Sequence, residues 1–208
     1  MGNSASSIYV ILSHGRSGST LLRRLLSEHS QICAPPEPWL LWCLEKAFDH
    51  GGFPGRCLDA FLSEEKDELT GSCVRMIVRS KLKAVGKSVF VEKTPRNYEI
   101  LPFINKIIPE SKIIYLRRDL RAVIASALTR GGTWKSKMRK RLCGFVLRHT
   151  EHVIRVQRDI DWFVASLESD RLHEIDYEDL VAAPSAVLAE LFSWMGVEVE
   201  NICEYSPE

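Results

Sequence analysis

The sequence lacks the features that would place this chain outside the ordinary globular proteins. Its 208 residues carry 28 Lys and Arg against 27 Asp and Glu, and a formal net charge of +1 provides no field that attracts nucleic acid or an anionic membrane. No internal repeat, low-complexity tract or linker rich in Pro, Gly or Ser divides the chain. We therefore predict one domain over residues 1–208 with no nucleic-acid partner.

Long apolar runs and paired cysteines are also missing. The longest apolar stretches have the length of a strand, so we expect no transmembrane segment. The six cysteines show no CxxC or Cys/His spacing, which favours reduced, buried thiols in a cytoplasmic protein and no metal. The opening MGNSAS matches the N-myristoylation pattern, but a flexible polar leader over residues 1–7 explains it equally well, and both interpretations stay open.

Apolar runs and helical patterns alternate along the chain. Buried strands are predicted at residues 8–13, 88–93 and 112–118, with a weaker one at 171–178. Helices are predicted at residues 19–29, 36–50, 69–86, 119–132, 136–167 and 184–196. This alternation predicts an α/β fold, a three-layer sandwich with a central, mainly parallel sheet. Ligands of such sheets bind at the edge where strands end and helices begin.

The segment LSHGRSGSTLLRRLL, residues 12–26, lies at that edge after the first predicted strand. Its small residues let the backbone approach an anion, and the next helix offers unpaired N–H groups. The Gly-Lys-Ser/Thr ending of nucleoside triphosphatases is absent, because Ser19 stands where the lysine would follow the glycine. The guanidinium of Arg16 suits phosphate or sulfonate oxygens. The predicted anion site consists of Arg16, Ser17, Gly18, Ser19 and Thr20.

Further anion-binding side chains follow the third predicted strand. Arg118 stands at the strand end, and Ser126 lies eight positions later in the next predicted helix. Arg130 lies four positions beyond Ser126 and shares its helix face. Together they could enclose a second anion, although a helix with solvated arginines produces the same pattern. Two adjacent anion sites suit a nucleotide with separate 5′ and 3′ anions better than the single phosphate tail of ATP.

The motifs GRSGSTLL and YLRRDLRAVIAS resemble those of the PAPS-dependent sulfotransferases, especially the tyrosylprotein and bacterial branches, and the similarity runs from residue 8 to about residue 197. The resemblance implies a P-loop NTPase-like fold. It also implies in-line transfer of a sulfonate from 3′-phosphoadenosine-5′-phosphosulfate (PAPS) to a hydroxyl or amine, with adenosine 3′,5′-bisphosphate as product. The first motif would hold the 5′-phosphosulfate, and Arg118, Ser126 and Arg130 the 3′-phosphate. Tyr177 matches a tyrosine that contacts the nucleotide in the tyrosylprotein branch.

Two further segments supply expected catalytic residues. Transfer to a hydroxyl requires a base, and the resemblance assigns this role to Glu37 in APPEPWLL. Lys93, at the end of the second predicted strand, matches a family lysine that stabilises the transferring group together with Arg16. A glutamate that leads a helix and a lysine in solvent are the alternative interpretations of the first two residues. His14 is the fallback base.

The resemblance leaves the acceptor and the covering of the nucleotide open. The family's C-terminal nucleotide-covering loop has no counterpart before Glu208, and the basic segment 134–142 is a candidate substitute. Trp39, Trp42 and Phe48 suit an apolar, aromatic or sugar ring, although helix packing explains them equally well. Small-molecule, carbohydrate and peptide hydroxyls all fit as acceptors. A homodimer is also compatible with the sequence. The alternative functions are a nucleotide kinase or nucleoside triphosphatase and a non-catalytic adenosine-bisphosphate-binding protein.

Overall fold

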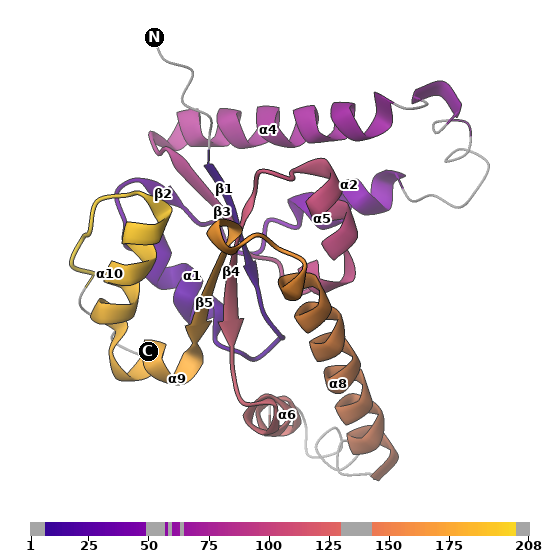
Figure 1. The fold of residues 1–208 in the computed structure, drawn as a ribbon, viewed down its shortest axis with the longest axis vertical. Coiled ribbons are helices and arrows are strands. Elements are labelled where there is room, and N and C mark those ends of the chain that lie inside the picture. Colours follow the sequence, from indigo (N-terminus) through magenta and orange to yellow (C-terminus); the bar gives the residue numbers. More distant parts are fainter. Residues whose placement is uncertain (1–6, 49–56, 58–59, 63–64, 130–142, 203–208) are drawn as a thin grey trace.

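The computed structural model describes residues 7–48, 57, 60–62, 65–129 and 143–202, the side chains of Phe48 and residues 143–146 excepted. Its strands form one sheet in the order β2-β3-β1-β4-β5 (Figure 1). All strand pairings in this sheet are parallel, so the predicted central, mainly parallel sheet is confirmed. The strands are β1 (Ser7–Leu12), β2 (Ile32–Cys33), β3 (Val89–Glu92), β4 (Lys112–Arg117) and β5 (Leu172–Asp176).

The two faces of the sheet are each covered by helices, which gives the predicted three layers. Tyr9 and Ile11 of β1 pack in one buried cluster with α1 (Ser19–Glu28), α9 (Tyr177–Ala182) and α10 (Pro184–Met195). Val10 and Leu12 point to the other cluster, because successive side chains of a strand alternate between faces. The helices of that second cluster are α2 (Leu40–Phe48), α4 (Lys66–Val85), α5 (Leu101–Ile107) and α8 (Cys143–Ala165).

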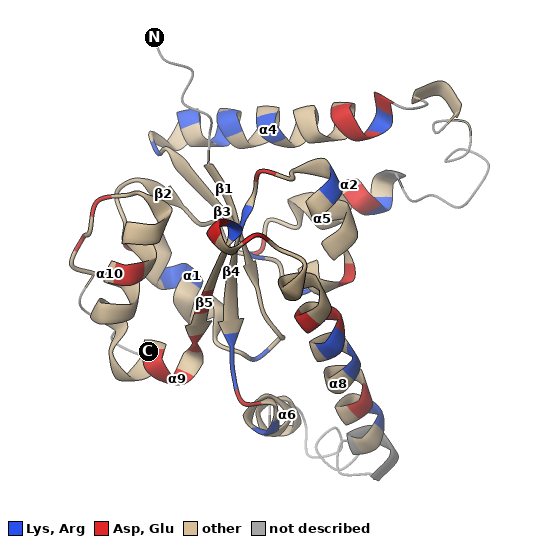
Figure 2. Cartoon of the chain, viewed as in Figure 1, with Lys and Arg blue, Asp and Glu red and all other residues tan. Residues whose placement is uncertain are grey.

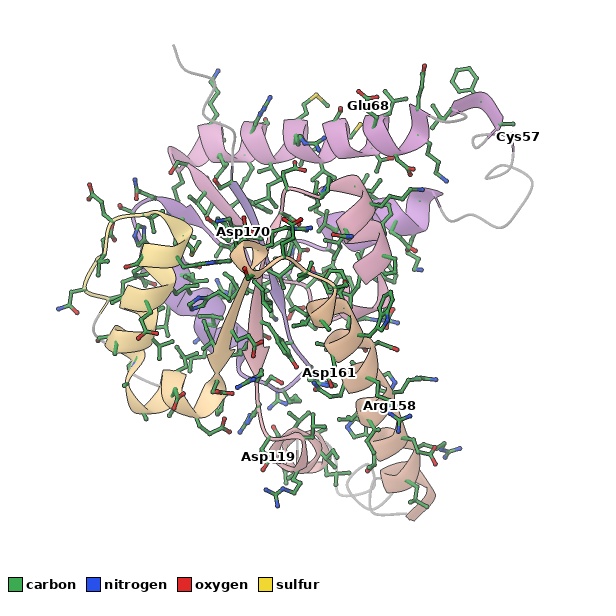
Figure 3. The ribbon with its side chains drawn as sticks, viewed as in Figure 1. Cys57, Glu68, Asp119, Arg158, Asp161 and Asp170 are labelled. Atoms are coloured by element: carbon green, nitrogen blue, oxygen red, sulfur yellow. The ribbon has the colours of Figure 1, made fainter. Side chains whose placement is uncertain are left out.

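Helix α6 (Leu120–Thr129) follows β4 beyond the edge of the sheet and contacts α8 (Figure 1). Asp119 lies at its start, as labelled in Figure 3, and its Oδ1 accepts the backbone N–H of Arg121 at 2.8 Å. This is the contact expected of an N-cap residue, so the predicted helix start is confirmed. The cap places the end of β4, and with it Arg118, directly before the first turn of α6.

Among the boundaries that differ from the prediction, three concern the leader and the candidate site. Ser7 belongs to β1, so the leader before the sheet ends at residue 6 rather than residue 7. The helix predicted from residue 36 begins at Leu40, because Glu37 and Trp39 have φ values of 41° and 54° that no right-handed helix contains. The strand predicted to residue 178 ends at Asp176, and Tyr177 begins α9.

Short elements between the predicted ones were not anticipated. They comprise β2, α5, α9 and the 3₁₀ turns Asn97–Glu99 and Ser169–Arg171. Their lengths of two to seven residues are too short to show a hydrophobic period. Residues 130–142 lie outside the described residues. They include the end of the helix predicted at 119–132 and the start of the helix predicted at 136–167.

Two other expectations concern membrane-spanning helices and the cysteine thiols. None of the helices in the described part of the chain is long and apolar enough to cross a membrane. Cys33, Cys43, Cys57 and Cys73 are free thiols, as expected. The expectation that the thiols are buried is wrong for Cys43 and Cys57, which are exposed because they lie on the solvent side of helical segments away from the sheet.

Candidate functional site

The loop between β1 and α1 brings backbone N–H groups to the positive end of a helix. The N–H of Ser17 donates to the carbonyl of His14 at 3.2 Å, and Arg16 and Gly18 both take left-handed conformations with φ values of 75° and 90°. The first turn of α1 contains no acidic residue, so no carboxylate of this helix competes for its N-terminus. The amides of residues 18–20 and the hydroxyls of Ser19 and Thr20 therefore form a site suited to an anion, whereas the buried Ser17 uses its amide within the loop.

Residues from β4 and α6 meet this loop directly. Arg118 Nη1 donates to the carbonyl of Arg16 at 2.7 Å, and Arg16 Nε donates to Ser126 Oγ at 3.2 Å. The guanidinium of Arg118 also lies over the ring of Tyr177, with 4.0 Å between its central carbon and the ring centroid. Four side chains predicted to bind one nucleotide thus lie next to one another at the carboxyl edge of the sheet.

Gly18 and Tyr177 are in close contact. A Cβ atom at position 18 would lie 2.3 Å from the Tyr177 ring, far inside van der Waals distance, and the φ of 90° is unfavourable for any other residue. The glycine is therefore required both by the turn and by the ring that covers it. Tyr177, at the first position of α9, joins the anion loop to the Arg118 guanidinium.

Arg117, the last residue of β4, and Arg118, which follows it, have different surroundings. Figure 2 shows Lys and Arg in blue at this end of β4. Arg117 Nε and Nη2 donate to Asp176 at 3.0 and 2.8 Å, and its Nη1 donates to Glu174 at 2.7 Å. The hydrogen bonds to Asp176 raise the pKa of Arg117. Arg118 Nε, by contrast, is buried without a hydrogen-bond partner among the described residues. Arg118 is the arginine that retains donors for an anion.

The candidate base and the candidate lysine form an ion pair. Lys93 Nζ donates to Glu37 Oε1 at 2.9 Å. The Lys93 side chain is only 4 % exposed, whereas that of Glu37 is 45 % exposed. Lys93 is therefore not a lysine in solvent, and Glu37 lies three residues before α2 rather than in its first turn. A carboxylate open to an acceptor, beside a buried ammonium, can take a proton while the lysine neutralises developing charge.

His14, the fallback base, belongs to a hydrogen-bond network with α8. Its Nε2 lies 3.0 Å from Gln157 Oε1, and Gln157 Nε2 donates to Tyr115 Oη at 2.8 Å and to Asp161 Oδ1 at 2.6 Å. Figure 3 labels Asp161 on α8. Burial lowers the pKa of His14 despite the hydrogen bond between its Nε2 and the Gln157 carbonyl oxygen, which accepts. Gln157 could not be predicted from the sequence, because a single glutamine on a long amphipathic helix has no distinguishing pattern.

A cavity of about 400 Å³ opens next to this network at the ends of β4 and β5. Its walls include His14, Tyr115, Arg118, Gln157 and Asp176. Arg118 thus contacts both the loop between β1 and α1, at Arg16, and an open volume on the α8 side of the sheet. The volume lies within the range of small-molecule sites in proteins, about 300–1,000 Å³.

The tryptophans after Glu37 form an aromatic pair. Trp39 and Trp42 make an edge-to-face contact with 5.4 Å between ring centroids, and the Arg96 guanidinium lies 5.5 Å from the Trp42 centroid. Both rings are partly exposed. The interpretation that they line an acceptor pocket stays a prediction. The side chain of Phe48, Arg130 and the basic segment 134–142 lie outside the described residues.

No group of three or more His, Cys, Asp and Glu side chains in the described part of the chain has the arrangement of a metal site.

Glu92 and Asn97 were not predicted from the sequence. Their side chains are buried, and Glu92 binds both Thr94 and Asn97 by hydrogen bonds. The signal was the position of a carboxylate at the end of an otherwise apolar strand. Burial raises the pKa of Glu92, and hydrogen bonds from Thr94 and Asn97 oppose the rise.

Comparison with known proteins places this geometry in a family. Residues 9–201 match the model described as the sulfotransferase family. Nodulation protein NoeE of Sinorhizobium fredii is 37% identical over 131 residues, which cover 57% of this chain and 30% of that protein. An uncharacterized protein of Aquifex aeolicus is 26% identical over 202 residues, covering 94% of this chain and 26% of that protein. The chain thus spans less than a third of the length of these curated relatives.

Two solved structures share the fold. The sulfotransferase domain from the curacin biosynthetic pathway superposes with a TM-score of 0.66 at 27% identity, covering 95% of this chain and 76% of that domain. The sulfotransferase domain of the Synechococcus PCC 7002 olefin synthase gives 0.66 at 25% identity, covering 97% and 77%. The expected sulfotransferase fold is confirmed. Because the family model covers residues 9–201, almost the whole described chain, this chain belongs to the sulfotransferase family.

Proposed function

We propose that the protein transfers a sulfonate group from PAPS to a hydroxyl or amine of an acceptor. The observation that carries this proposal is the row of contacts from Arg118 to Arg16 to Ser126 beside the N-terminus of α1. These contacts support the proposal that two anion-binding sets lie within reach of one nucleotide. The 5′-phosphosulfate would lie over residues 17–20, and the 3′-phosphate would bind Arg118, Ser126 and Arg130. Tyr177 would contact the nucleoside.

The proposed chemistry is one in-line displacement at sulfur. The acceptor oxygen attacks the sulfur as Glu37 takes its proton, the bond from sulfur to the 5′-phosphate oxygen breaks, and adenosine 3′,5′-bisphosphate leaves. Lys93 and Arg16 stabilise the charge that moves onto the sulfonate and the departing phosphate. In the free protein Lys93 already binds Glu37, so the buried ammonium holds the base beside the place where the sulfonate would arrive.

The alternative functions make different use of the same edge. A nucleotide kinase or nucleoside triphosphatase needs a lysine in the loop, and Ser19 occupies that position. A non-catalytic adenosine-bisphosphate-binding protein would use Arg118 and Ser126 but would not need the Glu37–Lys93 pair. The pair therefore supports an enzyme. For the acceptor we propose a small-molecule, carbohydrate or peptide hydroxyl whose ring can lie against Trp39 and Trp42.

We further propose that residues 1–208 form one domain that works in the cytoplasm as a homodimer. The free thiols of the described cysteines support a reducing compartment. The surface we propose for the homodimer is the outer stripe of α8, which consists of Leu147, Glu151, Ile154, Arg158 and Trp162. All are exposed, Trp162 by 73 %, and they lie opposite the buried Val153, Val156, Ile160 and Phe163.

The charge pattern of this stripe supports a second copy of α8 as its partner. In an antiparallel pair centred between residues 154 and 155, Leu147 of one copy lies opposite Trp162 of the other. The same centre places Glu151 opposite Arg158, so apolar and charged residues both match. Figure 2 shows residues of both signs along α8, and Figure 3 labels Arg158 on it.

The experiment that tests the activity starts with binding. We expect calorimetry to show that adenosine 3′,5′-bisphosphate binds without added metal and more tightly than ATP with Mg²⁺. A screen of hydroxyl and amine acceptors with PAPS carrying labelled sulfur should then identify a labelled product. A preference for ATP and magnesium would instead support the kinase alternative. Binding without transfer to any acceptor class would support the non-catalytic one.

A further inference from the structure

The carboxyl end of β3 holds the segment around Glu37 at two points. Lys93 Nζ donates to Glu37 Oε1 at 2.9 Å, and the backbone N–H of Trp39 donates to Thr94 Oγ1 at 3.1 Å. The two attachments come from consecutive residues and lie on either side of Pro38. One binds the carboxylate itself, and the other binds the backbone from which the carboxylate projects.

The attached backbone is strained. Glu37 has a φ of 41° and Trp39 a φ of 54°, and neither is a glycine. Left-handed conformations of such residues cost of order 1–3 kcal/mol each and persist only when the surrounding structure holds them. Pro38 adds a further restriction, because a residue before proline avoids the helical regions. The hydrogen bond from the Trp39 N–H to Thr94 therefore fixes a backbone shape that this segment would not keep alone.

Glu92 determines which way the Thr94 hydroxyl points. Its side chain is fully buried, and its Oε1 accepts a hydrogen bond from the Thr94 hydroxyl at 2.7 Å. Its Oε2 accepts a hydrogen bond from Asn97 Nδ2. A hydroxyl has only one proton, so donation to Glu92 leaves the oxygen lone pairs of Thr94 for the Trp39 N–H. The position of the Trp39 amide is thereby coupled to the buried end of β3.

We propose that Thr94 and Glu92 are positioning residues that hold the Glu37 carboxylate at the reaction centre. The inference rests on the proposed function insofar as Glu37 is the base. Neither residue touches the substrate in this scheme. Thr94 acts through the backbone of Trp39, and Glu92 acts through the hydroxyl of Thr94.

The test replaces the Thr94 hydroxyl without changing the shape of the side chain. Thr94→Val removes both hydrogen bonds, and Thr94→Ser restores them. The matched control is Thr70→Val, because Thr70 is also buried and its hydroxyl donates to the Lys66 carbonyl at 2.7 Å within α4, away from the site. If Thr94→Val does not fold, Thr94→Ala takes its place.

We expect Thr94→Val to lower kcat by about 10- to 100-fold, the effect of misplacing a catalytic group by a fraction of an ångström to an ångström. The Kd of adenosine 3′,5′-bisphosphate should stay within about twofold, since no nucleotide contact is lost. Thr94→Ser should recover most of kcat. The backbone amide of Trp39 should exchange with deuterium faster in Thr94→Val than in the wild type and in Thr70→Val, whatever the substrate.

Unchanged kcat in Thr94→Val, or unchanged exchange of the Trp39 amide, would overturn the positioning role. Equal losses of kcat in Thr94→Val and Thr70→Val would also overturn it, because the effect would then be one of general stability. If the wild type transfers no sulfonate, the proposed function fails, and the amide exchange alone decides whether Thr94 holds this segment.

Discussion

Arg118 donates a hydrogen bond to the backbone carbonyl of Arg16 at 2.7 Å, and its guanidinium carbon lies 4.0 Å from the ring centroid of Tyr177. The carbonyl holds Nη1, and the ring covers the guanidinium. A guanidinium over an aromatic ring gains about 0.5–2 kcal/mol, and an already oriented side chain loses less entropy when an anion binds. The structure thus prepares Arg118 for a ligand that lies next to the loop after β1.

Arg118→Ala should weaken the binding of adenosine 3′,5′-bisphosphate by about 1.5–3 kcal/mol, the cost of losing a hydrogen bond to a charged group. Isothermal titration calorimetry measures this as a rise in Kd of roughly 10- to 150-fold. Arg117→Ala is the matched control, because this neighbour already binds Asp176 and Glu174. Equal Kd values for Arg118→Ala and the wild type would remove the role assigned to Arg118.

Gly18→Ala should impair both folding and nucleotide binding. The new Cβ would approach the Tyr177 ring to 2.3 Å, and the backbone would keep a φ of 90° that costs of order 1–3 kcal/mol for alanine. We expect a lower Tm and a higher Kd for the bisphosphate. Gly15→Ala is the control, because no atom lies within 4 Å of a Cβ at that position. Identical behaviour of the two variants would contradict the close contact of Gly18 with Tyr177.

Glu37→Gln should lower kcat by about 10²- to 10⁴-fold, the usual contribution of a general base. The amide keeps the size of the side chain and can still accept a hydrogen bond from Lys93, so the Kd of the bisphosphate should not change. Glu28→Gln, at an exposed position of α1, controls for the loss of one carboxylate. Full activity in Glu37→Gln would leave His14 as the group to test next.

The residues at the carboxyl ends of the strands could be predicted from the sequence better than their contacts with the loop around Glu37. The strands that directly precede Arg118 and Lys93 consist mostly of buried apolar residues, and the spacing of Arg118 and Ser126 follows from helix geometry. The contact of Glu37 with Lys93 joins residues 56 positions apart, and no local pattern encodes it. Only the family resemblance suggested that these two residues work together.

Other features depend on tertiary contacts that single residues do not reveal. Pro36 and Pro38 flank Glu37, but they do not reveal that Glu37 and Trp39 take left-handed conformations. The Thr94 hydroxyl that binds the Trp39 amide follows β3, 55 positions along the chain. Glu92 ends an apolar strand, and its burial became evident only with Thr94 and Asn97 around it. Short α5 and β2 lack the length that a periodicity needs.

Glu92 should make the protein less stable as pH rises. Burial raises the pKa of Glu92 above the value of about 4.3 expected in the unfolded chain. The native state therefore holds this proton to higher pH, so stability is highest below the unfolded pKa and is lost as pH rises through the native pKa. Glu92→Gln cannot titrate, and its free energy of unfolding should increase relative to wild type over that rise.

Urea unfolding from pH 4 upward measures this difference, and Glu110→Gln provides a control of opposite sign. Burial is the largest influence on Glu110 and favours a higher pKa. The hydrogen bond and charge of Arg75, with a backbone hydrogen bond and the charge of Arg171, together outweigh burial and lower the pKa. The stability that Glu110 contributes is present above its unfolded pKa and lost as pH falls through the native value. Parallel pH profiles for wild type and Glu92→Gln would contradict the raised pKa of Glu92.

Trp162→Glu should convert the proposed homodimer to monomers. The variant places a carboxylate in the apolar end of the α8 stripe, where the second copy would contribute Leu147. Glu151→Arg should also weaken the dimer by setting two cations opposite each other, and Glu151→Arg combined with Arg158→Glu should restore it, because the exchanged pair is again complementary. Size-exclusion chromatography with light scattering at several concentrations measures the mass.

Met76→Glu, at a 64 % exposed position of α4, is the matched control for a surface charge replacing an apolar side chain. A wild type that remains monomeric at every concentration would rule out this antiparallel pairing. So would a double variant whose dimer is no more stable than that of Glu151→Arg, because the pairing depends on the complementary charges at positions 151 and 158.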